Sequence, residues 1–151
     1  MHLEAGVNKG RVDKSLLAVE RAMVEIRRRQ RRRALARGAV GPHVDVLDVV
    51  EAAEESGERV TVSAVAQALG VDQPRASKLV AAAVEEGWVR READQADGRR
   101  AYLVRTASGR ELSEVIHERR QEAFDRAMDG WTDAEREVFA SLLGRFVGGL
   151  P

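Results

Sequence analysis

The chain has 151 residues, is most simply a single domain and is long enough to bury a core. Charged residues make up 33% and aromatic residues 4%, and the apolar share, carried by alanine, valine and leucine, favours a helical protein. The 25 basic and 25 acidic residues balance, and the absence of cysteine excludes disulfides, thiolate metal sites and cysteine-based redox sensing. A nucleic-acid function must therefore rest on where the charges sit.

The N-terminal residues have no apolar core of signal-peptide length, and no later run could span a bilayer, so we expect a cytoplasmic protein. Residues 1–11 are polar and are expected to form a flexible arm. Apolar residues then recur every three or four positions, which predicts a helix ending at Gly38. The stripe consists of Val12, Leu16, Val19, Met23 and Ile26.

The second half of this helix is rich in arginine: Arg27, Arg28, Arg29, Arg31, Arg32, Arg33 and Arg37. At about 100° per residue these side chains surround the helix, so they cannot all serve one surface. A solvated helix end and a contact with DNA phosphates or an acidic partner are about equally favoured. Because residues 45–58 carry six acids and no base, packing against that segment, within the chain or across a dimer, is favoured for part of the run.

A second helix is predicted from about Pro42 to Ser56, with Gly57 at its end. Residues 60–62 are β-branched and predict a minimal strand. Thr61 can also cap a third helix that ends at Gly70.

Asp72 is the expected N-cap of a fourth helix that ends at Gly87. Its predicted buried stripe is Ala76, Leu79, Val80, Ala83 and Val84. The outward side chains of its first half can all hydrogen-bond to bases or phosphates, and none is acidic: Gln73, Arg75, Ser77 and Lys78. The helix is expected to enter a DNA groove, and an ordinary amphipathic surface helix is the alternative.

Residues 88–92 and 101–105 predict two strands joined by an eight-residue loop. Arg99 and Arg100 follow Gly98 at the loop tip, where an arginine could reach into a narrow minor groove. Asp94 and Asp97 are expected to pair with these arginines and orient them. A plain β-turn is the alternative.

Thr106 is predicted to cap a long helix that runs to about Asp129, and the capping box from Thr132 to Glu135 starts a last helix. That helix stays apolar nearly to its end, and no later element could cover it, which indicates a partner subunit. Its apolar residues are Val138, Phe139, Leu142, Leu143, Phe146 and Val147.

The predicted fold is mainly α with a small β-wing: a winged helix-turn-helix with six helices. Residues 12–151 form a single domain, in which 12–58 and 107–151 are dimerisation helices and 60–106 form the DNA-binding lobe.

The run Asp97-x-Arg99-x-x-x-Leu103-x-x-Thr106 resembles the wing signature D-x-R-x-x-x-L-x-L-T of the MarR (multiple antibiotic resistance regulator) family of winged-helix transcription factors. The segment L-G-V-D-Q-P-R-A-S-K-L-V is similar to the helix-turn-helix of that family. Arg105 departs from the pattern, which usually has leucine there. Its stem can pack at the same place, leaving the base of the wing looser or offering a further phosphate contact.

The resemblance implies a homodimer whose first and last two helices interlock. It implies Arg99 as the minor-groove residue, Asp97 as its support, and half-sites about 10 bp apart in a pseudo-palindromic operator. Repression is the commoner outcome in the family. Many members release DNA when a small ligand binds, and His43 is the candidate residue for such a pocket.

His2, His43 and His117 are well separated, so solvated or hydrogen-bonded histidines are favoured over a metal site. No metal or cofactor is expected. No catalytic motif is present, so an enzyme is not expected. The sequence therefore predicts a homodimeric DNA-binding regulator. The alternative is a winged-helix protein-protein interaction module without ligand response, which would expose apolar residues on the fourth helix and the wing.

Overall fold

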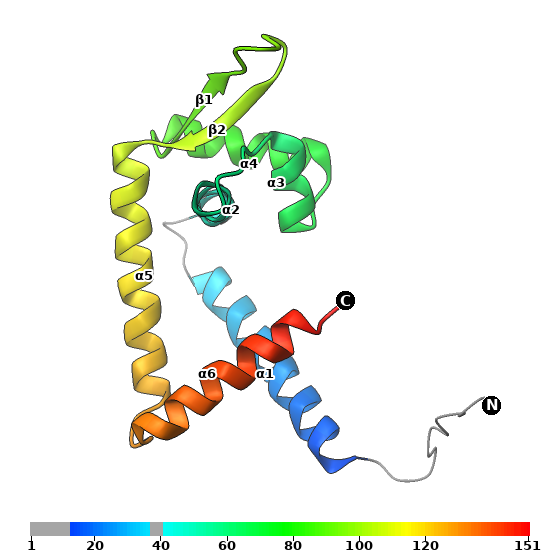
Figure 1. The fold of residues 1–151 in the computed structure, drawn as a ribbon, viewed down its shortest axis with the longest axis vertical. Coiled ribbons are helices and arrows are strands. Elements are labelled where there is room, and N and C mark those ends of the chain that lie inside the picture. The colour runs from blue at the N-terminus through cyan, green and yellow to red at the C-terminus, as the bar shows by residue number, and fades with distance from the viewer. Residues whose placement is uncertain (1–12, 37–40) are drawn as a thin grey trace, which may run out of the picture. The chain divides into compact units, whose positions relative to one another are not determined.

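The computed structural model describes residues 13–36 and 41–151, and the chain divides into two compact units, Met1–Val44 and Asp45–Pro151 (Figure 1). The first unit contains α1 (Lys14–Ala36) and a short 3-10 helix, η1 (Pro42–Val44). The second contains α2 (Asp45–Glu55), α3 (Val62–Leu69), α4 (Gln73–Glu85), β1 (Val89–Ala93), β2 (Ala101–Arg105), α5 (Ala107–Ala127) and α6 (Asp133–Gly148). The predicted six helices and two-stranded wing are confirmed over the described residues.

Some predictions are not tested by these residues. The arm, Val12, Arg37 and the helix end at Gly38 lie outside the described part of the chain. The boundary between the two compact units falls inside the proposed dimerisation segment 12–58. The division into dimerisation helices and a DNA-binding lobe stays a prediction.

The core of the second unit is built mainly from valine and alanine side chains, with two leucines, from α2, α3, α4 and the wing. Fully burying one such side chain contributes about 1.5–3 kcal/mol, so this cluster holds the lobe together. Its members include Val46, Leu47, Val50, Val65, Val80, Val89 and Leu103. Leu79 and Val84 of the predicted α4 stripe are only half-buried.

The helix-turn-helix is fixed by caps at both of its helix starts. Thr61 Oγ1 accepts the Ala64 N–H at 3.2 Å, and Asp72 Oδ1 accepts the Arg75 N–H at 2.8 Å. Between the helices, Gly70 has φ 63°, a left-handed conformation that glycine adopts without steric cost. The predicted cap residues are therefore confirmed.

The wing is an antiparallel pair in which Val89 lies opposite Arg105 and Ala93 opposite Ala101. The first strand begins one residue later than predicted. The predicted strand at residues 60–62 is wrong: only Val60 pairs with the wing, accepting the Leu103 N–H at 2.9 Å, because the chain turns into α3 at Val62.

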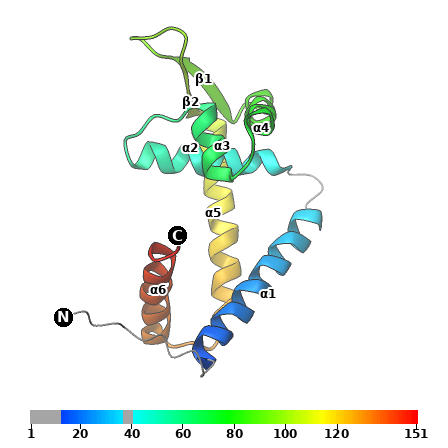
Figure 2. The same ribbon diagram turned by 90° about the vertical axis from the view of Figure 1, so that its right-hand side faces the viewer.

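The helix α5 leaves the wing, and α6 follows after Gly130, whose φ is 78° (Figure 2). The predicted capping box is present, since Thr132 N donates to Glu135 Oε2 at 2.8 Å and Glu135 N to Thr132 Oγ1 at 3.2 Å. An edge-to-face contact of Trp131 with Phe139, at 5.3 Å between centroids, supports the turn. No residue of α6 is buried within the chain.

Gly109, in the first turn of α5, packs directly against the backbone that precedes β1. A Cβ at this position would collide with the carbonyl oxygen of Trp88. The same junction is bonded by Thr106, whose N–H donates to Trp88 O at 3.0 Å. The start of α5 is therefore held against the end of the α4–β1 turn by a contact that requires glycine.

We expect Gly109→Ala to lower the free energy of unfolding by about 1–3 kcal/mol, because overpacking outweighs the better helix propensity of alanine. Urea denaturation measures this loss. Gly98→Ala is the matched control, since a Cβ there meets open space, and it should leave the midpoint nearly unchanged. Equal midpoints for the two variants would contradict the close-packing interpretation.

Candidate nucleic-acid interface

The first half of α4 presents polar side chains to solvent while its opposite side is buried. Ala76, Val80 and Ala83 are fully buried against the lobe and fix the orientation of the helix. The four predicted recognition residues are all exposed, and within the described residues their side chains make no hydrogen bond or ion pair: Gln73, Arg75, Ser77 and Lys78. The structure thus brings them together on one exposed helix start, where the backbone N–H groups favour anions.

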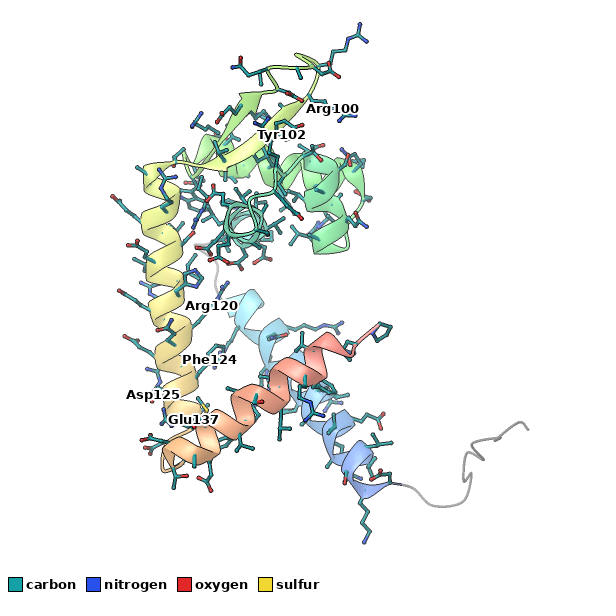
Figure 3. The ribbon with its side chains drawn as sticks, viewed as in Figure 1. Arg100, Tyr102, Arg120, Phe124, Asp125 and Glu137 are labelled. Carbon is teal, nitrogen blue, oxygen red and sulfur yellow. The ribbon has the colours of Figure 1, made fainter. Side chains whose placement is uncertain are left out.

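The wing tip is a tight turn organised by Asp97. Its carbonyl oxygen accepts the Arg100 N–H at 2.9 Å, and its Oδ1 accepts the Arg99 N–H at 3.1 Å. Asp97 therefore fixes the backbone that carries the arginines, as an aspartate does in an Asx-turn. The predicted pairing of its carboxylate with the arginine guanidinium groups is not observed. Both arginines are exposed, and Figure 3 labels Arg100 beside the wing.

Asp94 was also predicted to pair with the wing arginines, and it does not. Its Oδ1 accepts the Ala96 N–H at 3.0 Å, and its Oδ2 accepts the Tyr102 hydroxyl at 3.0 Å. Arg59 approaches Oδ1 at 3.9 Å and lies 5.0 Å from the centroid of the Tyr102 ring. The hydrogen bonds from Ala96 and then Tyr102 lower the pKa of Asp94. The stabilisation is therefore present at neutral pH and is lost as the pH falls through that lowered pKa.

Arg105, the departure from the family pattern, is bound by two carboxylates of α2. Its Nε donates to Glu54 Oε2 at 2.8 Å, its Nη1 to Glu51 Oε1 at 2.6 Å, and its backbone N–H to Glu54 Oε1 at 2.9 Å. The side chain is 11% exposed. Burial opposes its charge, but the bonds and charges of Glu54 and Glu51 outweigh that effect and raise the pKa of Arg105.

These contacts correct the expectation for Arg105, which is neither a phosphate contact nor the cause of a loose wing. A charged guanidinium held by two carboxylates anchors the last residue of β2 to α2. The sequence carried a signal for this network in acids spaced three apart on α2, Asp48, Glu51 and Glu54, which share one helix face.

The same acidic face of α2 also binds α5. Arg120 makes a bidentate contact with Asp48, at 3.0 and 2.7 Å, and Figure 3 labels Arg120 on α5. His117 Nε2 lies 2.8 Å from Glu51 Oε2, so His117 is hydrogen-bonded, as was favoured. The α2 acids were expected to pack against the arginine run of α1. Three of them have basic partners from β2 and α5, because the fold places those residues beside α2. Packing of the arginine run against this segment would join the two compact units and stays a prediction.

His43 lies in η1, half-buried, and its ring packs closely on Gly41, where a Cβ would approach Nδ1 to 2.7 Å. A cavity of about 110 Å³ lies elsewhere, between α2 and the wing, and is lined by Glu58, Arg59 and Tyr102 among others. His43 does not line it. Over residues 13–36 and 41–151, no group of three metal-ligating side chains converges, and no helix has the length and apolar character to cross a membrane.

A helix-turn-helix followed by an arginine-tipped hairpin defines a winged helix-turn-helix protein. Within that class, the family model described as MarR family matches residues 41–100. The matched residues include the helix-turn-helix and the first strand of the wing, and the fold of the chain is that of solved MarR-family structures.

Three solved structures illustrate the likeness. A MarR family protein from Bacillus stearothermophilus is 20% identical, with a TM-score of 0.72 over 91% of this chain and 97% of that one. A mutant of S. aureus MepR is 19% identical, with a TM-score of 0.67 over 93% and 100%. A mutant of MarR from E. coli is 20% identical, with a TM-score of 0.66 over 91% and 98%. No functionally curated protein matches the chain.

We expect Arg105→Leu to lower the free energy of unfolding by about 2–3 kcal/mol. This is less than the ~3–5 kcal/mol typical of a fully buried broken pair, because Glu54 is 29% exposed and Glu51 keeps His117. Urea denaturation measures the change. Arg91→Leu removes an equal charge from an exposed position of β1 and should stay within about 0.5 kcal/mol of wild type. Adding Glu51→Gln and Glu54→Gln to Arg105→Leu should restore part of the loss, and no recovery would contradict the network.

Proposed function

We propose that this protein is a sequence-specific regulator of transcription that binds double-stranded DNA as a homodimer and represses from a pseudo-palindromic operator. The observation that carries the proposal is the pair of exposed elements described above. The start of α4 and the wing tip expose cationic, amide and hydroxyl side chains that have no partner within the described residues, and the carboxylate of Asp97 beside them is bound to the backbone of the turn.

The start of α4 has the chemistry of base readout. Arg75 can contact guanine through two hydrogen bonds, and Gln73 can do the same with adenine. Ser77 and Lys78 suit phosphate contacts, which set the register of a protein on the duplex. Asp72, which begins this surface, accepts the Arg75 N–H as the helix cap. A protein-binding winged helix would expose apolar residues here, so the DNA-binding interpretation is better supported.

The wing supports the same interpretation. Asp97 and Asp94 are engaged by backbone N–H groups, and Asp94 also by Tyr102, so their charges stabilise the turn. Arg99 and Arg100 remain exposed at the tip. In the proposal Arg99 enters the minor groove, where a narrow groove focuses negative potential on a cation.

Dimerisation is supported by the apolar surface of the long helices. On α6, Val138 is 58% exposed and Leu142 is 51% exposed, and Phe124 on α5, labelled in Figure 3, is 59% exposed. A helix of this length that buries nothing is marginal in water, and a second copy supplies the missing cover. Two lobes would then meet half-sites about 10 bp apart.

Release by a small ligand, with His43 at the pocket, remains part of the proposal. Its basis is the family resemblance and the position of His43 in η1, just before α2.

The wing assignment is tested by Arg99→Ala. We expect a loss of about 1–3 kcal/mol in operator affinity by fluorescence anisotropy, with unchanged thermal unfolding, because the exposed side chain supports nothing in the fold. Arg119→Ala on α5 removes an equal charge from an exposed position and should bind as wild type does. Full-strength and equally salt-dependent binding of Arg99→Ala would refute the assignment.

The dimer is tested by light scattering at micromolar concentration, where we expect twice the mass of one chain. Leu142→Glu should shift the mass toward the monomer, because it introduces a charge into the proposed apolar interface. Glu137→Gln on the same helix should not. A monomeric mass for the wild-type protein would refute the dimer.

A further inference from the structure

The C-terminal half of α1 carries a feature that the proposed function does not use. Residues 27–33, here named the arginine collar, hold six arginines around one glutamine, and all seven side chains are exposed. The apolar stripe of the helix ends at Ile26, so the collar has no apolar side with which to pack. The helix thus changes from an amphipathic segment to a cationic one.

The collar is poorly neutralised within its own helix. Glu25 accepts from Arg29 Nε at 2.8 Å and from Arg32 Nη2 at 3.4 Å, and in the described residues the other four arginines make no ion pair. The hydrogen bond from Arg29 lowers the pKa of Glu25. In three pairs of collar arginines the two residues lie four positions apart, and each such like-charge pair destabilises the helix by about 0.2–0.5 kcal/mol. A polyanion would relieve this repulsion.

The acids that could have neutralised the collar are already bound. Asp48, Glu51 and Glu54 of α2 have Arg120, His117 and Arg105 as partners. Half of the six acids at residues 45–58 are therefore engaged inside the second unit, which favours a polyanion from outside the chain as the partner of the collar.

The distribution of the arginines around the helix indicates the kind of polyanion. At about 100° per residue, Arg27 and Arg31 lie on one side and Arg29 and Arg33 about 160° away. A flat partner surface would engage one side only. A helix about 10–12 Å across lying in a DNA major groove about 12 Å wide has phosphates on both sides. Guanidinium groups suit these phosphates because they bind them bidentately.

We propose that the arginine collar contacts the phosphate backbone of double-stranded DNA from two sides of α1. The inference rests on the proposed DNA-binding function and adds a second contact to the α4–wing interface. The collar has no side chain for base readout other than Gln30, so its contribution is independent of sequence and strongly salt-dependent.

The test compares two double variants of the full chain, Arg27→Gln/Arg31→Gln and Arg29→Gln/Arg33→Gln, on duplexes selected from genomic DNA and on a scrambled duplex. Each phosphate contact removed lowers the slope of log affinity against log salt by about 0.9. We expect both variants to lose slope by a similar amount on both duplexes. Arg119→Gln/Arg126→Gln on α5 is the charge-matched control and should keep the wild-type slope.

Several outcomes overturn the inference. They are an unchanged slope in either collar variant, a loss confined to the selected duplex, or an equal loss in the α5 control. Thermal unfolding and light scattering check that the variants remain folded and keep the wild-type mass, which is expected because the collar side chains are exposed and the loss of the exposed Arg29–Glu25 pair is offset by reduced repulsion. If the collar variants keep the wild-type slope while Arg99→Ala weakens binding, the inference fails and the proposed function stands. If the wild-type protein binds neither duplex, both fail.

Discussion

The acidic face of α2 is the contact on which the arrangement of the second unit depends. Glu51 and Glu54 hold Arg105 at the end of β2, and Asp48 holds Arg120 on α5. One short helix is thereby bonded to the base of the wing and to the long helix that follows it. Since these pairs are partly shielded from water, they orient the elements as well as attract them.

The proposed DNA-reading surface consists of the start of α4 and the wing tip. It depends on that framework, but its side chains take no part in the ion pairs of α2. The acids near the wing and the recognition helix are satisfied by backbone N–H groups and by Tyr102, while the basic side chains beside them stay exposed. Local structure thus fixes these carboxylates in the turn and the helix cap, where they remain charged, and leaves the basic side chains available to a phosphate backbone. A chain of zero net charge in this way gathers exposed basic side chains on one surface.

The long helices present two different surfaces. The apolar side chains of α6 remain exposed in a single chain, and in the proposed homodimer a second copy covers them. The arginine collar has no apolar side, so it suits a polyanion. The long helices therefore carry separate surfaces for the two interactions of the proposed function, which are association with a second copy and attraction to DNA.

The sequence by itself determined the order of helices and strands, the caps at Thr61, Asp72 and Thr132, and the composition of the reading surface, because all of these depend on residues close together in the chain. It did not determine which charges pair. Arg105 and Glu51 are 54 residues apart, and Asp94 accepts a hydrogen bond from Tyr102 rather than from the neighbouring arginines. The close approach of Gly109 to Trp88 could likewise not be predicted from the sequence. These contacts exist only once β2 and α5 lie against α2, so the tertiary structure decided them.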